Sequence, residues 1–212
     1  FPSTILVKIS KEVGWLRVFI SMFILALLLT GCGGDPNRIS QAELVEVQEK
    51  LDEFEVKQTI DEQSEDDFVF RLVSEKEEYR PEEPVELYGE IIHTGDEKIT
   101  IVHGSPAVMF RIEEQIRGHE FAPAIREVAI YSPLMPNDPF RQEFMKQGIF
   151  YSEELHSEEY IAFIEDLLER DGFPPGYYTV KATTAFYDGT MHREIEAEVD
   201  FKVLTGTNGD SP

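Results

Sequence analysis

From residue 68 onward, apolar and polar residues alternate with the two-residue period of β-strands that have one buried and one solvated face. The alternation is most regular over residues 178–186 and 195–203, and Asp188-Gly189 between them is a hairpin turn signal. Further candidate strands cover residues 68–73, 85–91, 99–103, 108–112, 127–131 and, more weakly, 141–147. Seven to eight strands within residues 68–205 predict one all-β, antiparallel sandwich that is large enough to bury its own core.

The last predicted strand shows what this alternation implies for individual side chains. Val199 and Phe201 are two residues apart and should face the core together, whereas Glu198 and Asp200 should face solvent. We therefore expect replacement of Phe201 by alanine to be costly. Replacement of Glu198 or Asp200 is expected to change the free energy of unfolding by less than about 0.5 kcal/mol.

One short helix is predicted to interrupt the strands. Ser157 is a preferred N-cap residue, and Glu158 and Glu159 suit the positive end of a helix. Gly172 is placed to end the helix. The predicted apolar stripe consists of Tyr160, Phe163, Ile164, Leu167 and Leu168.

Residues 32–67 are predicted to form an acidic tether before the sandwich. Ser40-Gln41-Ala42-Glu43 matches a capping box. Apolar residues then recur at helical spacing, at Leu44, Val47, Leu51 and Phe54. This pattern favours a short amphipathic helix, and pairing with a second copy is the alternative. Residues 61–67 have no apolar side chain, which favours a flexible spacer that contributes little to the fold. Residues 206–212 are expected to be a disordered tail.

The first 31 residues have the three parts of a bacterial secretory signal. Basic residues up to Arg17 are followed by an uncharged run over residues 18–30 and by small residues before Cys32. The run has 13 residues, fewer than the ~20 that a membrane-spanning helix needs. Cys32 is the only cysteine, which excludes disulfides within this chain. A lone cysteine is often a buried core residue, but this position next to an apolar run favours a targeting role.

Leu29-Thr30-Gly31-Cys32 resembles the lipobox of bacterial lipoproteins. The resemblance implies that residues 1–31 are removed as a signal peptide and that the Cys32 sulfur is alkylated by a diacylglycerol. Two acyl chains suffice for stable anchoring in a bilayer. The expected location is therefore the cell membrane, with the protein lipid-anchored on its extracytoplasmic face.

Three stretches of the predicted sandwich resemble immunoglobulin-like domains of the BsuPI type, named for a bacillar intracellular proteinase inhibitor. The stretches are Pro84-Val85-Glu86-Leu87, Thr94-Gly95-Asp96-Glu97 and Pro175-Gly176-Tyr177-Tyr178-Thr179-Val180. The resemblance spans most of residues 79–187 and implies an immunoglobulin-like fold. It also implies an inhibitor activity, which in an exported protein would act on an extracytoplasmic protease.

The charge balance limits the classes of partner. The chain has 19 basic and 42 acidic residues, a formal net charge of −23. Nucleic acids and anionic lipid surfaces are therefore poor partners, because binding to them needs clustered lysine and arginine. The acidity favours either attraction to a basic protein or to cations, or a solvated surface that keeps the protein soluble.

No residue pattern points to catalysis, a cofactor or a metal. Gly104-Ser105-Pro106 lacks the flanking glycines and the following helix of a hydrolase elbow. No two of the five histidines are two or four residues apart. His93 and His103 lie on predicted neighbouring strands and would meet across a hairpin, but strand histidines are more often ordinary polar residues than zinc ligands. We therefore expect a protein that is not an enzyme and has no cofactor.

The segment that covers residues 102–110 and 119–140, between the more regular strands, has no clear periodicity. It is rich in proline, methionine and aromatic residues, and long loops on a rigid β scaffold are where binding residues concentrate. Its candidate contact residues are Phe121, Tyr131, Leu134, Met135 and Phe140. The alternative is that the segment folds back onto the edge of the sandwich. The sequence as a whole favours a non-catalytic protein- or peptide-binding module, with proteinase inhibition as the alternative function.

Overall fold

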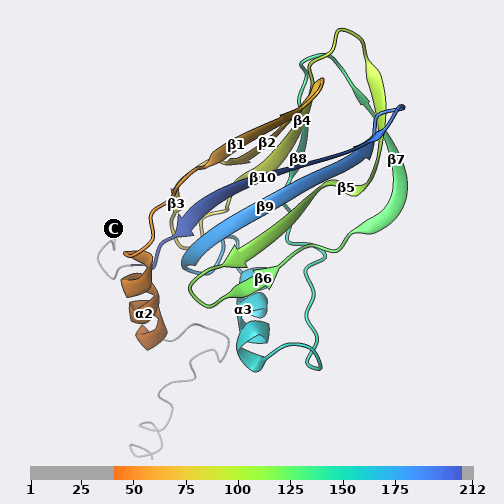
Figure 1. Cartoon of the computed structure of the whole chain (residues 1–212). Helices are drawn as coiled ribbons and strands as arrows, with labels where there is room; N and C mark the ends of the chain where they lie inside the picture. Colours follow the sequence, from red (N-terminus) through yellow and green to blue (C-terminus); the bar gives the residue numbers. More distant parts are fainter. Residues whose placement is uncertain (1–40, 207–212) are drawn as a thin grey trace, which may run out of the picture. The chain divides into compact units, whose positions relative to one another are not determined.

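The computed structural model describes residues 41–206, which fold into two packed β-sheets with two short helices (Figure 1). The predicted signal peptide, the lipobox with Cys32, Ser40 of the capping box and residues 207–212 lie outside the described residues. Neither helix in the described part is long and apolar enough to cross a membrane.

Sheet A has the strand order β1-β2-β4-β8, and every pairing in it is antiparallel. Its strands are β1 (Ile60–Glu65), β2 (Phe68–Ser74), β4 (Leu87–His93) and β8 (Phe140–Glu143). Sheet B has the order β3-β10-β9-β5-β6, and β7 also pairs with β5. Its strands are β3 (Glu78–Tyr79), β5 (Ile99–Glu114), β6 (His119–Phe121), β7 (Arg126–Leu134), β9 (Gly176–Tyr187) and β10 (His192–Val203). Only the short β3–β10 pairing in sheet B is parallel.

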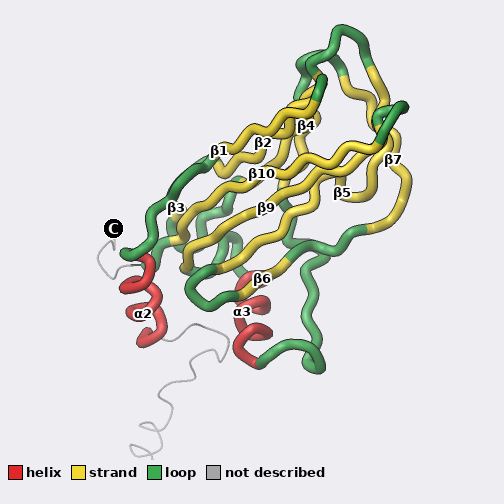
Figure 2. The backbone as a smooth tube through the Cα atoms, in the orientation of Figure 1, coloured by secondary structure: helices red, strands yellow, loops and turns green. Residues whose placement is uncertain are grey.

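The predicted all-β sandwich with a short inserted helix is confirmed. Figure 2 shows the strands in two layers and both helices at one end of the described part. The core lies between the sheets, because alternate residues of each strand point inward. Phe70, Leu72 and Ile91 from sheet A are fully buried against Val180, Val199 and Phe201 from sheet B.

The number of strands is larger than the alternation alone predicts. The described residues form ten strands, because β1, β3 and β6 are short or polar and show no clear period. The candidates over residues 99–103 and 108–112 are one continuous strand, β5, with a register shift between His103 and Val108 in its pairing with β9.

The inserted helix α3 (Glu158–Glu169) begins as predicted. The Ser157 hydroxyl accepts a hydrogen bond from the Tyr160 N–H at 3.2 Å. The C-cap is Arg170, in an extended conformation, so the predicted role of Gly172 in ending the helix is wrong. A Cβ at Gly172 would lie 2.4 Å from the Glu83 carbonyl oxygen, so the glycine allows two backbones to approach closely.

The predicted boundary between the tether and the sandwich at residue 68 is wrong. Residues 60–65, most of the expected flexible spacer, form strand β1 and pair with β2 over its whole length. The spacer lacks apolar residues because β1 is an edge strand, and all six of its side chains are exposed or partly exposed. Polar edge strands of this kind also resist unwanted pairing with other chains.

The predicted amphipathic helix is present as α2 (Gln41–Leu51), and it packs on the sandwich. Val47 and Leu51 are buried against Tyr177, whose ring stacks on Phe54 with the ring centroids 4.4 Å apart. The expectation that the tether contributes little to the fold is therefore wrong. Tyr177 lies on the outer face of β9, which the alternation predicts to be solvated. The sequence contains no signal that a helix covers this face.

Asp200 explains how the chain passes from α2 to β1. Its carboxylate accepts hydrogen bonds from the backbone N–H groups of Lys57 and Gln58 at 2.8–3.1 Å, and also one from the Tyr177 hydroxyl. Asp200 is only 4% exposed, so its predicted solvent-facing role is wrong. Burial and the hydrogen bond to this carboxylate raise the pKa of Tyr177 well above its usual value.

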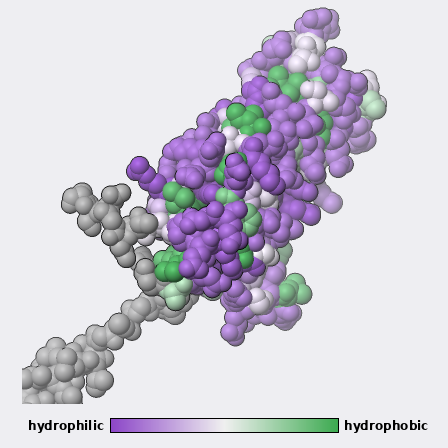
Figure 3. Space-filling model, turned by 60° about the vertical axis from the view of Figure 1, so that its left-hand side comes forward, coloured by the Kyte–Doolittle hydropathy of each residue, from purple (hydrophilic) through white to green (hydrophobic). Residues whose placement is uncertain are grey.

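The contacts of Asp200 belong to a closed side of the sandwich, where the segment 57–61 covers the free edge of β10. The Glu198 N–H donates to the Asp61 carboxylate at 2.9 Å, and the Asp200 N–H donates to the Gln58 carbonyl at 3.0 Å. Figure 3 turns the left-hand side of Figure 1 forward and shows a mostly hydrophilic surface with small separate apolar patches.

Three alanine variants of β10 test this arrangement. Phe201→Ala should lower the free energy of unfolding by about 3–5 kcal/mol, because it leaves a cavity in the core. Asp200→Ala should lower it by about 2–3 kcal/mol, because two backbone N–H groups and a hydroxyl lose a charged acceptor. Glu198→Ala, which removes only an exposed ion pair with Lys181, should stay within about 0.5 kcal/mol. Denaturant unfolding measures all three, and a tolerated Asp200→Ala beside a damaging Glu198→Ala would contradict the assigned faces.

Candidate functional site

The edge of sheet B opposite the closed side contains a gap. β7 pairs with β5 from Ile99 to Ser105, and β6 pairs with β5 from Ile112 to Glu114. Between these pairings, residues 106–111 of β5 have no described strand beside them on this edge, only the connection 122–125 between β6 and β7. Both ends of this connection are paired with β5, so it runs along the gap without making regular strand pairs.

A cavity of about 300 Å³ lies at this gap, and we call it the β5 groove. β5 forms its floor, the segment 123–126 forms one wall, and the segment 142–148 forms the other. The lining residues are Ser105, Pro106, Val108, Phe110, Pro123, Ala124, Arg126, Gln142, Glu143, Met145, Gln147 and Gly148. Apolar side chains dominate the floor, and a few polar groups lie around them, as in many binding sites.

A side chain replaces one of the missing strand contacts. The Ala107 N–H on the floor donates to the Gln142 side-chain oxygen of β8 at 3.2 Å. An amide side chain offers the same acceptor as a backbone carbonyl. The Ala107 N–H in the gap is therefore satisfied by a side chain of the other sheet.

The two walls meet where β6 leads into β7. The Ala124 N–H donates to the Gly148 carbonyl at 3.0 Å, so the segment turns away from β5 toward the opposite wall. Gly148 has φ +94°, and a Cβ there would lie 3.2 Å from the Ala124 nitrogen. Both the conformation and the close approach favour glycine at this position.

Lys146 fixes the second wall to the end of α3. Its ammonium group donates to the carbonyl oxygens of Leu167, Arg170, Asp171 and Gly172 at 2.6–3.2 Å. These carbonyls lie at the end of α3, where backbone acceptors lack partners within the helix. Burial and the nearby Arg170 lower the pKa of Lys146 to about 8, so the amine is still mostly charged at neutral pH.

Ion pairs fix β8, which begins the second wall, to the rest of sheet A. Side chains that face each other across the four strands alternate in charge, in the order Glu62, Arg71, Glu90 and Arg141. The Glu90 side chain is only 6% exposed and pairs with Arg71 at 3.2 Å and with Arg141 at 2.9 Å. A carboxylate this buried needs both partners, so β8 is held even though only four of its residues are in the sheet.

β7 leaves apolar side chains uncovered beside the groove. Figure 1 shows β7 at the outer edge of sheet B, beyond the strands that face sheet A. Ser132 and Leu134 near its end are buried, but Ile130 is 37% exposed, and Val128 and Ile125 are 50% and 54% exposed. We call the β5 groove together with Ile125, Val128 and Ile130 the open side.

The five residues predicted to form a contact loop do not form one surface. Their segment folds into β6, β7 and β8 instead of a long loop. Phe121 and Leu134 are 3% and 1% exposed and belong to the core, so their prediction as contact residues is wrong. Phe140 is partly buried against the core. Tyr131 and Met135 are 71% and 47% exposed, near the open side in sequence but not lining its groove.

Sequence reasoning missed most of the groove residues for an identifiable reason. Gln142, Met145 and Gly148 lie in a weak strand and a turn, and their juxtaposition with Ala124 depends on pairing across the two sheets. The only signal available in the sequence was the segment rich in proline, methionine and aromatic residues that has no clear periodicity.

Two buried histidines satisfy local hydrogen bonds. β4 and β5 lie in different sheets, so the predicted hairpin between His93 and His103 is wrong. His93 contacts the carbonyls of Asp67 and Glu97. In the range 41–206, no group of three histidine, cysteine, aspartate or glutamate side chains is arranged to hold a metal ion.

His103 forms a pair with Ser132 that has the hydrogen-bond pattern of a nucleophile and a base. Its Nδ1 lies 2.6 Å from the Gly104 carbonyl, which can only accept, so Nδ1 carries the proton and Nε2 accepts from the Ser132 hydroxyl at 2.8 Å. Both residues are less than 9% exposed, and neither lines the β5 groove. The pair therefore serves to satisfy buried polar groups between β5 and β7.

The comparisons with known proteins do not identify a family for this chain. No protein-family model matches the chain, and no curated protein matches it. Among solved structures, the chain is similar to one titled "X-ray structure of Northeast Structural Genomics Consortium target SoR45". The sequence identity is 14%, the match covers 73% of this chain and 86% of that chain, and the TM-score is 0.30. A likeness this distant carries no conclusion about function.

Lys146→Met tests whether the ammonium group fixes the groove wall. The variant keeps an apolar stem but leaves four carbonyl oxygens without their shared donor, so the free energy of unfolding should fall by about 1–3 kcal/mol. Hydrogen exchange at the Ala124 N–H, which bonds to the same wall, should accelerate. Lys181→Met, at an exposed position on β9, is the matched control and should change neither measurement. Equal behaviour of the two variants would show that Lys146 does not hold the wall.

Proposed function

We propose that this chain is a lipid-anchored, extracytoplasmic protein whose β-sandwich binds a protein or peptide partner through the open side. The observation that carries the proposal is the uncovered apolar surface of β7 next to a groove in an unpaired sheet edge. Val128 and Ile130 are two residues apart on β7 and therefore share a face, and exposed apolar side chains close to a cavity are typical of interaction sites.

The distribution of polar groups supports binding over catalysis. The walls of the groove are held by Lys146 and by the ion pairs of Glu90, and these charged groups are fully engaged in structural contacts. The groove itself is lined by apolar groups, amides, one arginine and one glutamate. Such a lining suits recognition of apolar side chains and a polypeptide backbone.

The larger cavities are less suited to this role. One of about 670 Å³ lies between the segment 53–57 and the outer face of sheet B, and one of about 760 Å³ lies near β3. Both are lined mainly by charged and polar side chains. They lack the apolar floor that gives the β5 groove its affinity for a partner's side chains.

The location part of the proposal rests on the lipobox-like residues that end at Cys32. Eight residues separate Cys32 from the first residue of α2, and a fully extended chain of that length spans at most about 30 Å. An anchor at Cys32 would therefore keep the sandwich close to the bilayer surface. The partner would be another extracytoplasmic protein of the same membrane or its surroundings.

Cys32→Ser tests the anchor. Because no other residue of the chain offers a thiol for alkylation, the variant should lose the mass of the lipid and should be uncleaved or released from the membrane. Mass spectrometry of membrane and soluble fractions gives the result. Membrane-associated, cleaved protein with an unmodified Cys32 would contradict the anchor but would leave the binding site untouched.

Site-specific photo-crosslinking tests the binding site. A photoreactive residue at Val128 should give an adduct with one discrete protein in intact cells, and Ile130→Asp should abolish the adduct by placing a charge on the apolar surface. The matched control is the same photoreactive residue at Ile60, which is 57% exposed on the opposite edge of sheet A. Equal labelling from both positions would contradict the open side as the interface. A protease in the adduct would support the inhibitor function that the BsuPI resemblance implies.

A further inference from the structure

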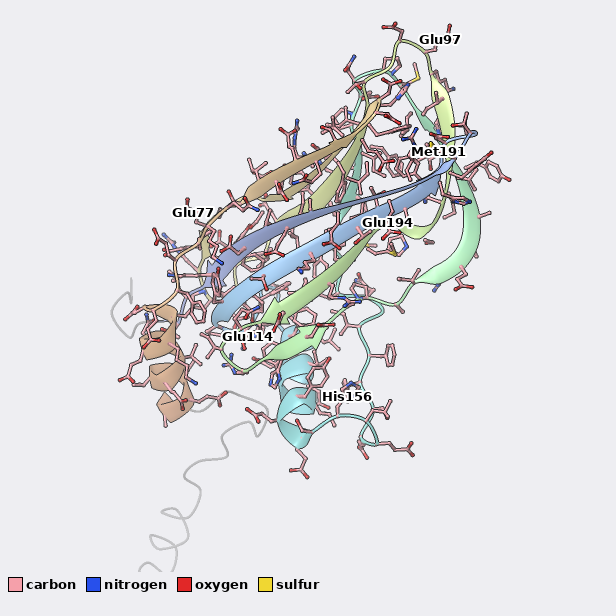
Figure 4. All side chains as sticks on the ribbon, viewed as in Figure 1. Glu77, Glu97, Glu114, His156, Met191 and Glu194 are labelled. Carbon is pink, nitrogen blue, oxygen red and sulfur yellow. The ribbon has the colours of Figure 1, made fainter. Side chains whose placement is uncertain are left out.

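We infer that the loop before α3 is a second interaction surface, and that it fits a protein with an apolar pocket surrounded by basic side chains. We call residues 150–157 the α3 loop. The inference goes beyond the proposed function, because neither Phe150 nor Leu155 of this loop lines the β5 groove. Figure 4 labels His156 of the α3 loop beside α3, away from Met191 at the other end of the strands.

Two large apolar side chains of the α3 loop are mostly exposed. Phe150 is 68% exposed and Leu155 is 77% exposed, whereas Ile149 just before them is buried. Apolar surface in contact with water is unfavourable, and a partner that covers both side chains removes this surface from water. The loop therefore offers a partner two apolar contacts.

The α3 loop is held in place by contacts with its own residues and with α3. The Leu155 N–H donates to the Ser152 carbonyl at 3.1 Å, and the His156 N–H donates to the same carbonyl at 3.0 Å. The His156 ring stacks on Tyr160 of α3, with the ring centroids 4.6 Å apart. A loop that is ordered before binding loses little conformational freedom when a partner covers it, which favours a binding role.

Acidic side chains surround the two apolar ones. Between Lys146 and Arg170 the sequence has seven acidic residues and no lysine or arginine. Four of the seven are exposed and form no ion pair with a lysine or arginine of the described residues. These four are Glu153, Glu154, Glu158 and Glu159. An apolar centre with a polar rim is the usual arrangement of an interface, and an acidic rim is complemented by lysine or arginine.

The same charges disfavour the other occupants of an exposed apolar loop. A bilayer surface with anionic lipids repels acidic side chains, and segments that bind such surfaces carry lysine and arginine instead. A second copy of this chain has the same net charge of −23 and is repelled as well. A basic protein surface is therefore the occupant that suits both the apolar and the acidic side chains.

The proposed anchor would keep the α3 loop near the bilayer. Only eight residues separate Cys32 from α2, and Figure 2 shows α2 and α3 at the same end of the described part. The partner of the α3 loop would therefore be a basic protein close to the same membrane.

Three short synthetic peptides and the full-length protein in a neutral detergent test the inference. The first contains leucine and lysine, the second has serine in place of leucine, and the third has glutamate in place of lysine. The leucine–lysine peptide should bind and should protect the amides of residues 150–155 from hydrogen exchange. The other two should bind at least ten-fold more weakly, because one lacks the apolar contact and the other is repelled.

Two matched pairs of variants separate the apolar contribution from the charge. Leu155→Ser should weaken the leucine–lysine peptide at least ten-fold, whereas Ile60→Ser, at an aliphatic residue that is 57% exposed on β1, should not. Glu153→Gln should weaken it about two- to five-fold, the usual effect of one exposed ion pair. Glu194→Gln, at an exposed glutamate of β10, should bind as the unaltered protein does. The unfolding midpoint should be the same in all four variants, because each replaced side chain is exposed.

Photo-crosslinking in intact cells tests the kind of partner. A photoreactive residue at Leu155 should label a basic protein, and Phe150→Ser should abolish the adduct. An adduct with lipid, with an acidic protein or with a second copy of this chain would overturn the inference. Equal binding of the leucine–lysine and serine–lysine peptides, binding without protection of residues 150–155, or no binding of any peptide would also overturn it. Labelling from Val128 is a separate result, which decides whether the open side is an interface.

Discussion

The hydrogen-bonding needs of strand edges govern how this sandwich is built. A sheet that does not close into a barrel has two free edges, and its backbone groups must find partners or remain exposed. On one side, the segment after α2 covers β10, with Asp200 and Gln58 supplying the acceptors. On the other side, β6 and β7 cover the two ends of β5 and leave its middle to a single glutamine side chain.

Buried charged side chains fix the segments that hydrogen bonds between strands do not fix in place. Lys146 gathers the last carbonyls of α3, and Glu90 is placed between Arg71 and Arg141 across sheet A. Each charged group has several hydrogen-bonding partners, which offsets the loss of hydration on burial. The first set of contacts ends at Lys146, within the segment 142–148, and the second ends at Arg141, the residue before it. The groove wall is therefore rigid, although it has little regular secondary structure.

The groove and the exposed apolar residues of β7 beside it are consistent with the proposed recognition of a partner's side chains. Preorganised walls reduce the loss of conformational freedom on binding, and exposed apolar residues on β7 extend the surface beyond the groove. In the proposed function, the acidic surface would disfavour acidic partners, because like-charged segments repel one another.

The sequence by itself determined the class of fold, the two long C-terminal strands and the capped helix α3, because each depends on local periodicity and on neighbouring residues. It also contains the lipobox-like residues, whose proposed role rests on local sequence alone. Only the tertiary structure decided that polar residues 60–65 form a strand, that Asp200 is buried, and that Phe121 and Leu134 belong to the core. These outcomes depend on which distant segment lies opposite each residue. The groove also depends on tertiary structure. Its walls are formed by segments that adjoin strands of different sheets, and no local sequence pattern shows that these segments lie together.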